Sequence, residues 1–381
     1  MLCTLACAAP APERAPGQVP EWTLRRSVTI GQPDHPVYGL SDVGDVLAAG
    51  DLVYILMRQE RTIRVFTQGG EFVRDLGRGG EGPGELASPA MMGWRGPETI
   101  WVSDVRLRHR FTFLDVATGD AETVSFRVDA TAYREGGMTG LAGMGVRFLA
   151  APRRSSAVSV AGTVREPIVV ADAAGAVRDT LALRRIDGDD FAVITAGIRS
   201  DGRAYRSHPL PASDMLGLAP DGSGAVIVDR RSWTGSGSAE FGVTRVDSWG
   251  DTLFHRRFAY EPLPVPAGYF DREIEQELED PSGFIVDRRE YAEALRAFYE
   301  RRRYFPPVTS VLLAANHATW LAGPEEGGER GWLVLDPSGS TTGSFRLPAD
   351  SYIRFATATE CWVDELDDFD IPYLVRYDIV P

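Results

Sequence analysis

The sequence predicts an all-β fold, a six-bladed β-propeller with a helical insertion. The chain of 381 residues holds 40 glycines and 25 prolines, a composition that suits many short strands joined by tight turns. A unit of four strand-like segments recurs along the chain. The last copy of this unit is one strand short, and a spare strand-like segment precedes the first copy.

The clearest copy of the unit runs from Asp51 to Gly77. Its apolar residues alternate with polar ones, as in half-buried strands, and Gly69-Gly70 supplies a turn that can adopt positive φ angles. The alternating positions are Ile63, Val65, Phe72 and Leu76. Further copies occupy residues 99–126, 168–183, 225–254, 318–347 and 354–378.

The final unit ends at Asp378 without a fourth strand, which would leave the N–H and C=O groups of a sheet edge unpaired. Residues 22–30 read as a strand and lie before the first unit. We expect this segment to pair with the last unit near Tyr373–Tyr377 and to close the ring. Five complete units and one split unit then make a single propeller of six blades over residues 21–381.

Two stretches of the first unit carry a family resemblance. Val65 to Phe72 reads Val-Phe-Thr-Gln-Gly-Gly-Glu-Phe, and a glycine-rich linkage with Gly-Pro-Gly runs from Leu76 to Leu86. This pattern resembles the NHL repeat, and the second unit adds a His109-Arg110 pair similar to the one that names the family. The first unit has Arg61-Thr62 at that place. The resemblance covers residues 31–128 as a motif and implies a six-bladed, NHL-like binding propeller.

The first residues resemble the end of a bacterial lipoprotein signal. Thr4-Leu5-Ala6 precede Cys7, and in that family the cysteine after a small residue becomes lipidated. A stretch rich in proline and alanine follows through Pro20, with the composition of a tether. Residues 1–20 are therefore interpreted as a signal remnant and tether. The protein is expected in the cell envelope, in contact with the membrane through a lipid on Cys7 only.

Residues 261–307 interrupt the repeat. Phe270, Ile274 and Leu278 follow helical spacing and predict a helix from Asp271 to Glu279. A second helix is predicted to begin after Asp287, which stands three residues before Glu290 as in a capping box. Arg301–Arg303 follow it, where the helix dipole favours cations.

The insertion has two readings. The helices are expected to bury their apolar faces on the propeller, either as a brace between blades or as a lid over the central channel. Residues 187–213 read as a second, loop-like insertion, which is a candidate to join the helices.

Composition excludes several chemistries. The net charge of −14 disfavours nucleic acid as a partner. All 40 basic residues are arginine, which excludes Schiff-base catalysis by lysine. The sequence has no GxSxG motif, no P-loop and no dinucleotide-binding glycine pattern between a strand and a helix, and its five histidines lack zinc-site spacing.

The candidate binding residues lie on the loops that join second and third strands, along one rim of the propeller. Arginine forks suit carboxylate or phosphate-like ligands. The rim candidates are Arg58, Glu60, Arg61, Asp104, Arg106, Arg108, Arg230 and Arg231.

The acidic run 364–370 is either a solvated loop, the favoured reading, or a weak site for a hard cation such as Ca²⁺. Its candidate ligands are Asp364, Asp367, Asp368 and Asp370. No other cofactor is expected.

These observations favour a non-catalytic binding propeller anchored at the cell envelope, acting as a monomer on an envelope protein, a peptide or a carbohydrate. The alternative is a hydrolase or lyase at the channel mouth, with or without a metal. Six-bladed propellers of the gluconolactonase kind bind calcium through glutamate, aspartate and asparagine side chains. This chain has a single asparagine, Asn316, which disfavours a lactonase-like calcium site. Strongly perturbed pKa values among channel groups would favour the enzyme.

Overall fold

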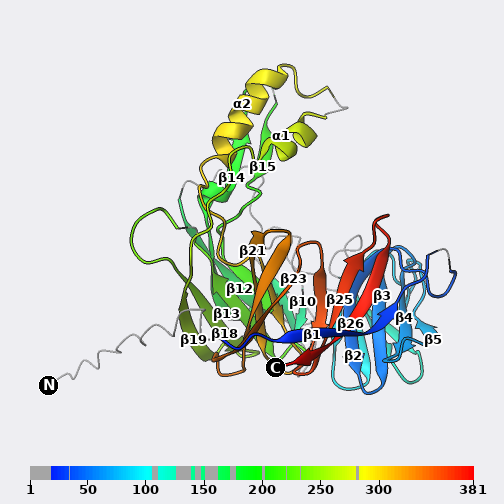
Figure 1. Cartoon of the computed structure of the whole chain (residues 1–381). Coiled ribbons are helices and arrows are strands. Elements are labelled where there is room, and N and C mark those ends of the chain that lie inside the picture. The colour runs from blue at the N-terminus through cyan, green and yellow to red at the C-terminus, as the bar shows by residue number, and fades with distance from the viewer. Residues whose placement is uncertain are drawn as a thin grey trace.

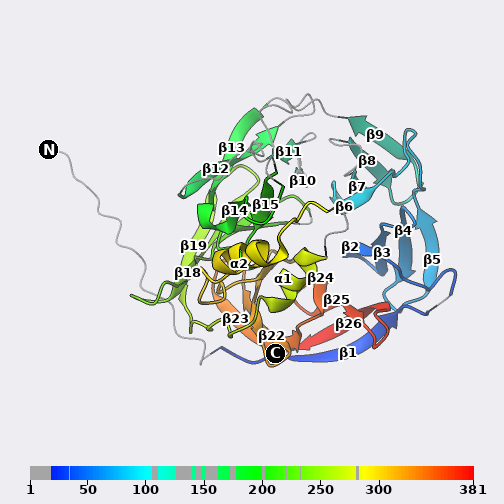
Figure 2. The same cartoon turned by 90° about the horizontal axis from the view of Figure 1, so that it is seen from above.

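The fold is a ring of four-stranded antiparallel sheets with a small module on one face (Figures 1 and 2). The computed structural model describes residues 19–33, 35–104, 110–125, 139–141, 147–150, 162–171, 177–199, 202–219, 221–231, 233–279 and 283–381. Within these ranges six sheets have four strands and one sheet has two.

The strands follow chain order within each ring sheet, apart from β1. The first sheet contains β2 (Val43–Ala49), β3 (Leu52–Met57), β4 (Thr62–Thr67) and β5 (Phe72–Leu76). The second contains β6 (Pro89–Trp94), β7 (Thr99–Asp104), β8 (Arg110–Asp115) and β9 (Ala121–Ser125). The third contains β10 (Thr139–Leu141), β11 (Arg147–Ala150), β12 (Val164–Ala171) and β13 (Val177–Ile186). The next two contain β16 (Met215–Leu218), β17 (Gly224–Asp229), β18 (Glu240–Asp247) and β19 (Thr252–Ala259); and β20 (Ser310–Leu313), β21 (Thr319–Glu326), β22 (Glu329–Leu335) and β23 (Thr341–Pro348). The last contains β24 (Tyr352–Ala356), β25 (Glu360–Leu366), β26 (Pro372–Val380) and β1 (Thr23–Ile30).

The first strand of each sheet is the inner one. β2 contacts β6 on one side and β24 on the other, and β20 contacts both β16 and β24. Figure 2 shows the sheets arranged radially around these inner strands. This arrangement confirms the predicted all-β propeller.

The N-terminal segment joins two sheets. Trp22 N donates to Ser344 O at 2.7 Å and Ser344 N donates to Pro20 O at 2.8 Å, so the segment first runs beside β23. β1 then pairs antiparallel with β26, from Thr23 opposite Val380 to Ile30 opposite Leu374. Trp22 lies edge-on to Trp320, with ring centroids 6.4 Å apart. Position 343 is glycine because a Cβ atom there would stand 2.0 Å from the Trp22 ring.

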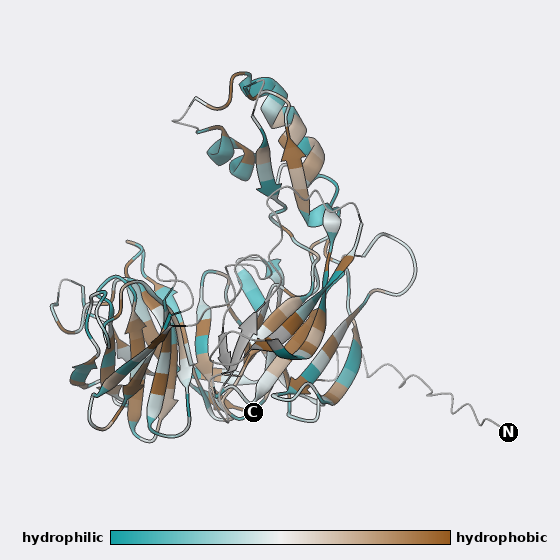
Figure 3. Ribbon diagram, turned by 180° about the vertical axis from the view of Figure 1, so that it is seen from behind, coloured by the Kyte–Doolittle hydropathy of each residue, from teal (hydrophilic) through white to brown (hydrophobic). Residues whose placement is uncertain are grey.

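Apolar cores lie between neighbouring sheets, and Figure 3 shows hydrophobic residues concentrated on the strands. Ile63, Val65 and Leu76 belong to the core between the first two sheets, whereas Phe66 belongs to the core on the other side. The middle strands β3 and β4 are therefore buried on both faces. The prediction of half-buried strands is wrong for them, because each sheet is sandwiched between two others.

Arginines of third strands hold the connections that precede their sheets. Arg110 donates to Glu81 O at 2.9 Å and to Glu85 O at 2.6 Å. In the first sheet Arg64 does the equivalent, donating to Val37 O at 3.0 Å and also to Gly39 O. Arg64 stands two residues after Thr62, which is the sequence equivalent of Arg110. The two arginines therefore make equivalent contacts, although Arg64 lies two residues further along its strand, on the same face as Thr62.

The two insertions fold together into one unit, called the module here and comprising residues 187–213 and 261–307 (Figure 1). The first contributes a 3-10 turn (Gly188–Asp190), β14 (Phe191–Ile194) and β15 (Ala204–Ser207), and the second contributes α1 (Asp271–Leu278) and α2 (Arg288–Tyr299). Their shared core comprises Ile194, Ile198, Ala204, Leu210, Phe270, Ile274, Tyr291, Leu295, Phe298, Tyr299 and Phe305. The expectation that the helices pack on the propeller is wrong, because the β14–β15 hairpin from the neighbouring sheet offers them an apolar face.

The capping residues of α2 also join the two insertions. The Asp287 carboxylate accepts from the backbone N–H groups of Arg289 and Glu290, both at 3.0 Å, as the capping-box spacing predicts. The Glu290 carboxylate accepts from Gly197 N at 3.1 Å instead of from the cap residue. Gly197 has a φ of +69° and lies so close to α2 that a Cβ would stand 2.3 Å from Asp287 O.

Candidate functional site

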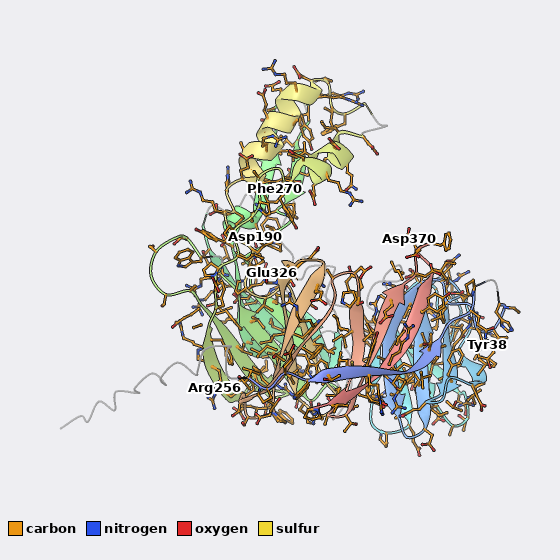
Figure 4. All side chains as sticks on the ribbon, in the orientation of Figure 1. Tyr38, Asp190, Arg256, Phe270, Glu326 and Asp370 are labelled. Atoms are coloured by element: carbon orange, nitrogen blue, oxygen red, sulfur yellow. The ribbon has the colours of Figure 1, made fainter. Side chains whose placement is uncertain are left out.

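The module marks one face of the ring, called the upper face here. Each insertion connects a fourth strand to the next first strand, from β13 to β16 and from β19 to β20. The connections between second and third strands, which carry the predicted rim residues, leave the ring on this same face. Figure 4 shows Glu326 and Asp370, at two of these connections, on the side of the ring that faces the module.

The rim residues of the first two sheets are held by local contacts. Arg58 forms an ion pair with Asp42 at 2.8 Å, and Glu60 accepts from Ser41 Oγ at 2.8 Å. Asp104 accepts from the N–H groups of Ala87 and Ser88 at 3.0 Å, which fixes a turn. Arg61 is exposed and has a φ of +57°. Arg106 and Arg108 lie outside the described residues.

Arg230, predicted as a rim ligand, is held by structural contacts. It is buried and donates to Ser213 O at 2.8 Å and to Val308 O at 3.2 Å. Burial lowers the pKa of its guanidinium to about 10. Arg231 stays exposed and pairs with Asp229 at 3.0 Å, in the fourth sheet and so across the ring from Arg58.

An ionic cluster around the buried Arg185 and Asp190 attaches the module to the ring. We call this cluster the neck; it consists of Arg185, Asp187, Asp190, Asp214 and Arg302. The Asp190 side chain accepts from Ala212 N and Ser213 N, both at 2.8 Å, and pairs with Arg302 at 2.9 Å. Arg185, at the end of β13, lies 3.3 Å from both Asp187 and Asp214. The Arg302 guanidinium is therefore engaged with the other insertion, while the Arg302 N–H donates to Tyr299 O at the end of α2.

His208 is a buried structural histidine above the neck. Its Nδ1 accepts from Leu210 N at 3.0 Å, so its Nε2 carries the proton and donates to Tyr299 O at 2.9 Å. The His208 imidazole packs against the side chains of Phe270 and Phe298. Burial lowers the pKa of the imidazole to about 4, which keeps it neutral at physiological pH.

The acidic run near the C-terminus forms a turn. Asp364 is buried and pairs with Arg354 at 2.6 Å, and Asp367 accepts from Phe369 N and Ile371 N at 2.9 and 3.0 Å. Asp368 and Asp370 are exposed. In the part of the chain that the structure describes, no group of three or more His, Cys, Asp or Glu side chains is arranged to hold a metal ion. The four candidate ligands do not converge.

Asp45 is the carboxyl with a perturbed pKa on an inner strand. Its pKa is raised above the ordinary value, mainly by burial, while Met92 N and the charges of Arg354 and Arg58 oppose the shift. The carboxylate accepts from Met92 N at 2.8 Å and so joins β2 to β6. This contact gives the group a structural role at the centre of the ring.

A pocket of about 850 Å³ opens in the module between β15 and α1. Arg206 and Glu277 pair across it at 2.7 Å. The pocket also borders Tyr299, whose pKa burial raises to about 12. The lining residues are Arg203, Ala204, Tyr205, Arg206, Ser207, Pro209, Glu273, Gln276, Glu277, Glu279, Phe284, Ile285 and Tyr299.

Sequence reasoning missed this pocket because it read residues 187–213 as a loop. One signal was available: Glu273 and Glu277 are spaced i, i+4 and lie off the apolar stripe of Phe270, Ile274 and Leu278. A smaller groove of about 380 Å³ lies between the sheets of β16–β19 and β20–β23, beside Val19.

Comparisons with known proteins show the fold alone. No family model and no curated protein matches the sequence. A member of the DUF4221 family from Bacteroides vulgatus is 11% identical and has a TM-score of 0.51, with 94% of this chain and 98% of that chain covered. A protein described as exported, from Bacteroides fragilis, is 10% identical, covers 95% of both chains and has a TM-score of 0.48.

The calcium-binding protein regucalcin from Agrobacterium tumefaciens is also 10% identical, with a TM-score of 0.39 and coverage of 93% of this chain and 95% of that chain. Among the described residues, no helix has the length and apolar character needed to span a membrane.

Proposed function

We propose that this protein is a non-catalytic binding propeller of the bacterial cell envelope, with six NHL-like blades, whose upper face and module receive the ligand. One observation carries the proposal. Two insertions from neighbouring sheets share a core on the same face and open a pocket of about 850 Å³ there. Insertions of repeat folds often map to the binding face, and ligand pockets are concave sites with a few polar groups.

The attachment of the module supports a role in binding. The neck places five charged side chains, each paired, between the module and the ring, and Figure 4 shows Asp190 at this junction. Binding sites perform best when rigid neighbours hold their side chains. The upper face of the last sheet also exposes apolar residues: Tyr352 at 54%, Leu366 at 45% and Phe369 at 82%.

Excision of the whole module tests this proposal. Residues 187–213 and 261–307 are each replaced by a short Gly/Ser link, because removing α1 and α2 alone would expose the apolar face of the β14–β15 hairpin. We expect the ring to keep its strand content by circular dichroism and to lose the envelope partner that the full protein captures. A ring without the module that captures the same partner with the same affinity would contradict the proposal.

The proposed lipid anchor is tested separately. We propose that Cys7 is lipidated and that residues 8–20 tether the ring to the membrane. Replacing Cys7 by serine is expected to move the protein, expressed in its own host, from the membrane fraction to the soluble fraction. Unchanged fractionation would show that another feature localises the protein.

A further inference from the structure

β15 has an open edge within the module. His208 N donates to Asp190 O at 2.7 Å, so His208 and Asp190 form a hydrogen-bonded pair. Arg206 lies opposite Ala192, two residues away from that pair on each strand. Hydrogen-bonded pairs alternate in antiparallel sheets, so Ala204 and Arg206 turn their backbone groups towards β14. Tyr205 and Ser207 therefore turn their N–H and C=O groups to the opposite side, where the Tyr205 C=O accepts from the Arg206 guanidinium at 3.2 Å. In the described part of the chain this sheet has only β14 and β15, so no third strand pairs there.

A groove follows this edge. Five consecutive residues, Arg203 to Ser207, form one wall of the pocket of about 850 Å³, and α1 contributes the facing wall. Five extended residues span roughly 17 Å. A groove between an edge strand and a helix accepts an extended peptide, because the peptide pairs with the strand while its side chains contact the helix.

The helical wall of the groove is acidic. α1 and the residue after it contribute Glu273, Gln276, Glu277 and Glu279. Arg206 neutralises Glu277 at 2.7 Å, but one carboxylate oxygen of Glu273, Oε2, is buried and has no hydrogen-bond partner in the described structure. A buried acceptor without a partner is costly, and a basic side chain of a ligand would satisfy it.

We propose that the edge of β15 is a strand-addition site for an extended basic peptide of a partner protein. The peptide adds as a third strand beside β15 and points arginine or lysine side chains at Glu273 and Glu279. This inference rests on the proposed function, since it names the class of ligand that the module binds.

Fluorescence anisotropy with synthetic peptides tests the site. The probe is an eight-residue peptide of alternating lysine and valine, compared with one of alternating glutamate and valine. Ser207→Pro removes the outward N–H and leaves the ladder to β14 intact, so we expect it to weaken binding of the basic peptide about tenfold or more. Ser207→Ala keeps the N–H and is expected to bind within about twofold of wild type.

Charge variants test the contribution of the acidic α1 wall separately from that of the β15 edge. Glu273→Gln with Glu279→Gln is expected to weaken binding and to reduce its salt dependence, whereas Glu275→Gln, outside the pocket lining, should change neither. Melting curves of all variants establish that the module stays folded.

Equal binding of the basic peptide by Ser207→Pro and wild type would overturn the proposal, as would equal affinity for the acidic peptide. If a chain lacking residues 1–18 binds the peptide much more tightly than the full chain, the occupant of the β15 edge is the protein's own N-terminal tail. If Ser207→Pro abolishes self-association of the protein, the occupant is a second copy of this chain. Either result also overturns the proposal. Loss of partner capture on module excision, together with any of these outcomes, would leave the proposed function standing.

Discussion

A chain that lacks residues 19–30 is expected to fail to form a stable ring. The deletion exposes the outer edge of β26 over the whole register with β1, from Leu374 to Val380. It also removes the buried Ile30 and the partly buried Trp22, Leu24 and Val28 from two cores. Each apolar side chain contributes about 1.5–3 kcal/mol when fully buried, and a typical domain is stable by only about 5–15 kcal/mol.

Point variants make the test independent of whether the deleted chain folds. Ile30→Ala removes a side chain that is 1% exposed and is expected to lower the free energy of unfolding by about 2–5 kcal/mol in urea titrations. Arg25→Ala, on the same strand but with a side chain 73% exposed, is expected to cost less than about 0.5 kcal/mol. A deleted chain that melts at the same temperature as the full protein would contradict the closure of the ring by β1.

Asp190→Ala is expected to be the most destabilising single substitution in the neck. It leaves Arg302 partly buried, with Asp187 3.4 Å away as its remaining partner, and it removes the acceptor of Ala212 N and Ser213 N. Breaking a buried ion pair by removing one partner typically costs about 3–5 kcal/mol. Urea denaturation measures the loss, and hydrogen exchange is expected to show faster exchange in the module than in the ring.

The neighbouring Asp189 provides the matched control for Asp190. It lies in the same 3-10 turn and is exposed, so Asp189→Ala should change the free energy of unfolding by less than about 0.5 kcal/mol. Similar unfolding curves for the Asp189 and Asp190 variants would show that the neck does not hold the module.

Local patterns in the sequence were sufficient for most strands of the ring, for the two helices and for the order of the sheets, but not for β14 and β15, which were read as a loop. The alternation around Ile63 and Val65 predicted strands, and the spacing of Phe270, Ile274 and Leu278 predicted α1. The spare segment 22–30 and the short last unit predicted the pairing that β1 and β26 make. These patterns succeed because strand and helix periodicities reflect burial of residues close in sequence.

The site depended on contacts that no local pattern contains. Arg230 and Arg231 are adjacent in sequence, yet one is buried under the module and the other is exposed. Glu290 was recognised as a capping residue, but its carboxylate holds Gly197 of the other insertion. In each case the partner comes from another connection of the ring, so the residue type indicated a charge but not its role.

The sequence by itself determined an all-β repeat that must pair its two ends, since an open sheet edge would leave backbone groups unpaired. The tertiary structure decided that the two insertions share one core, that Arg302 pairs with Asp190 across 112 residues of chain, and that β15 keeps an open edge beside α1. The reason is physical: apolar periodicity shows which face of a helix or strand is buried, but not which other element packs against it. The packing partner depends on which connections the closed ring brings together on its upper face.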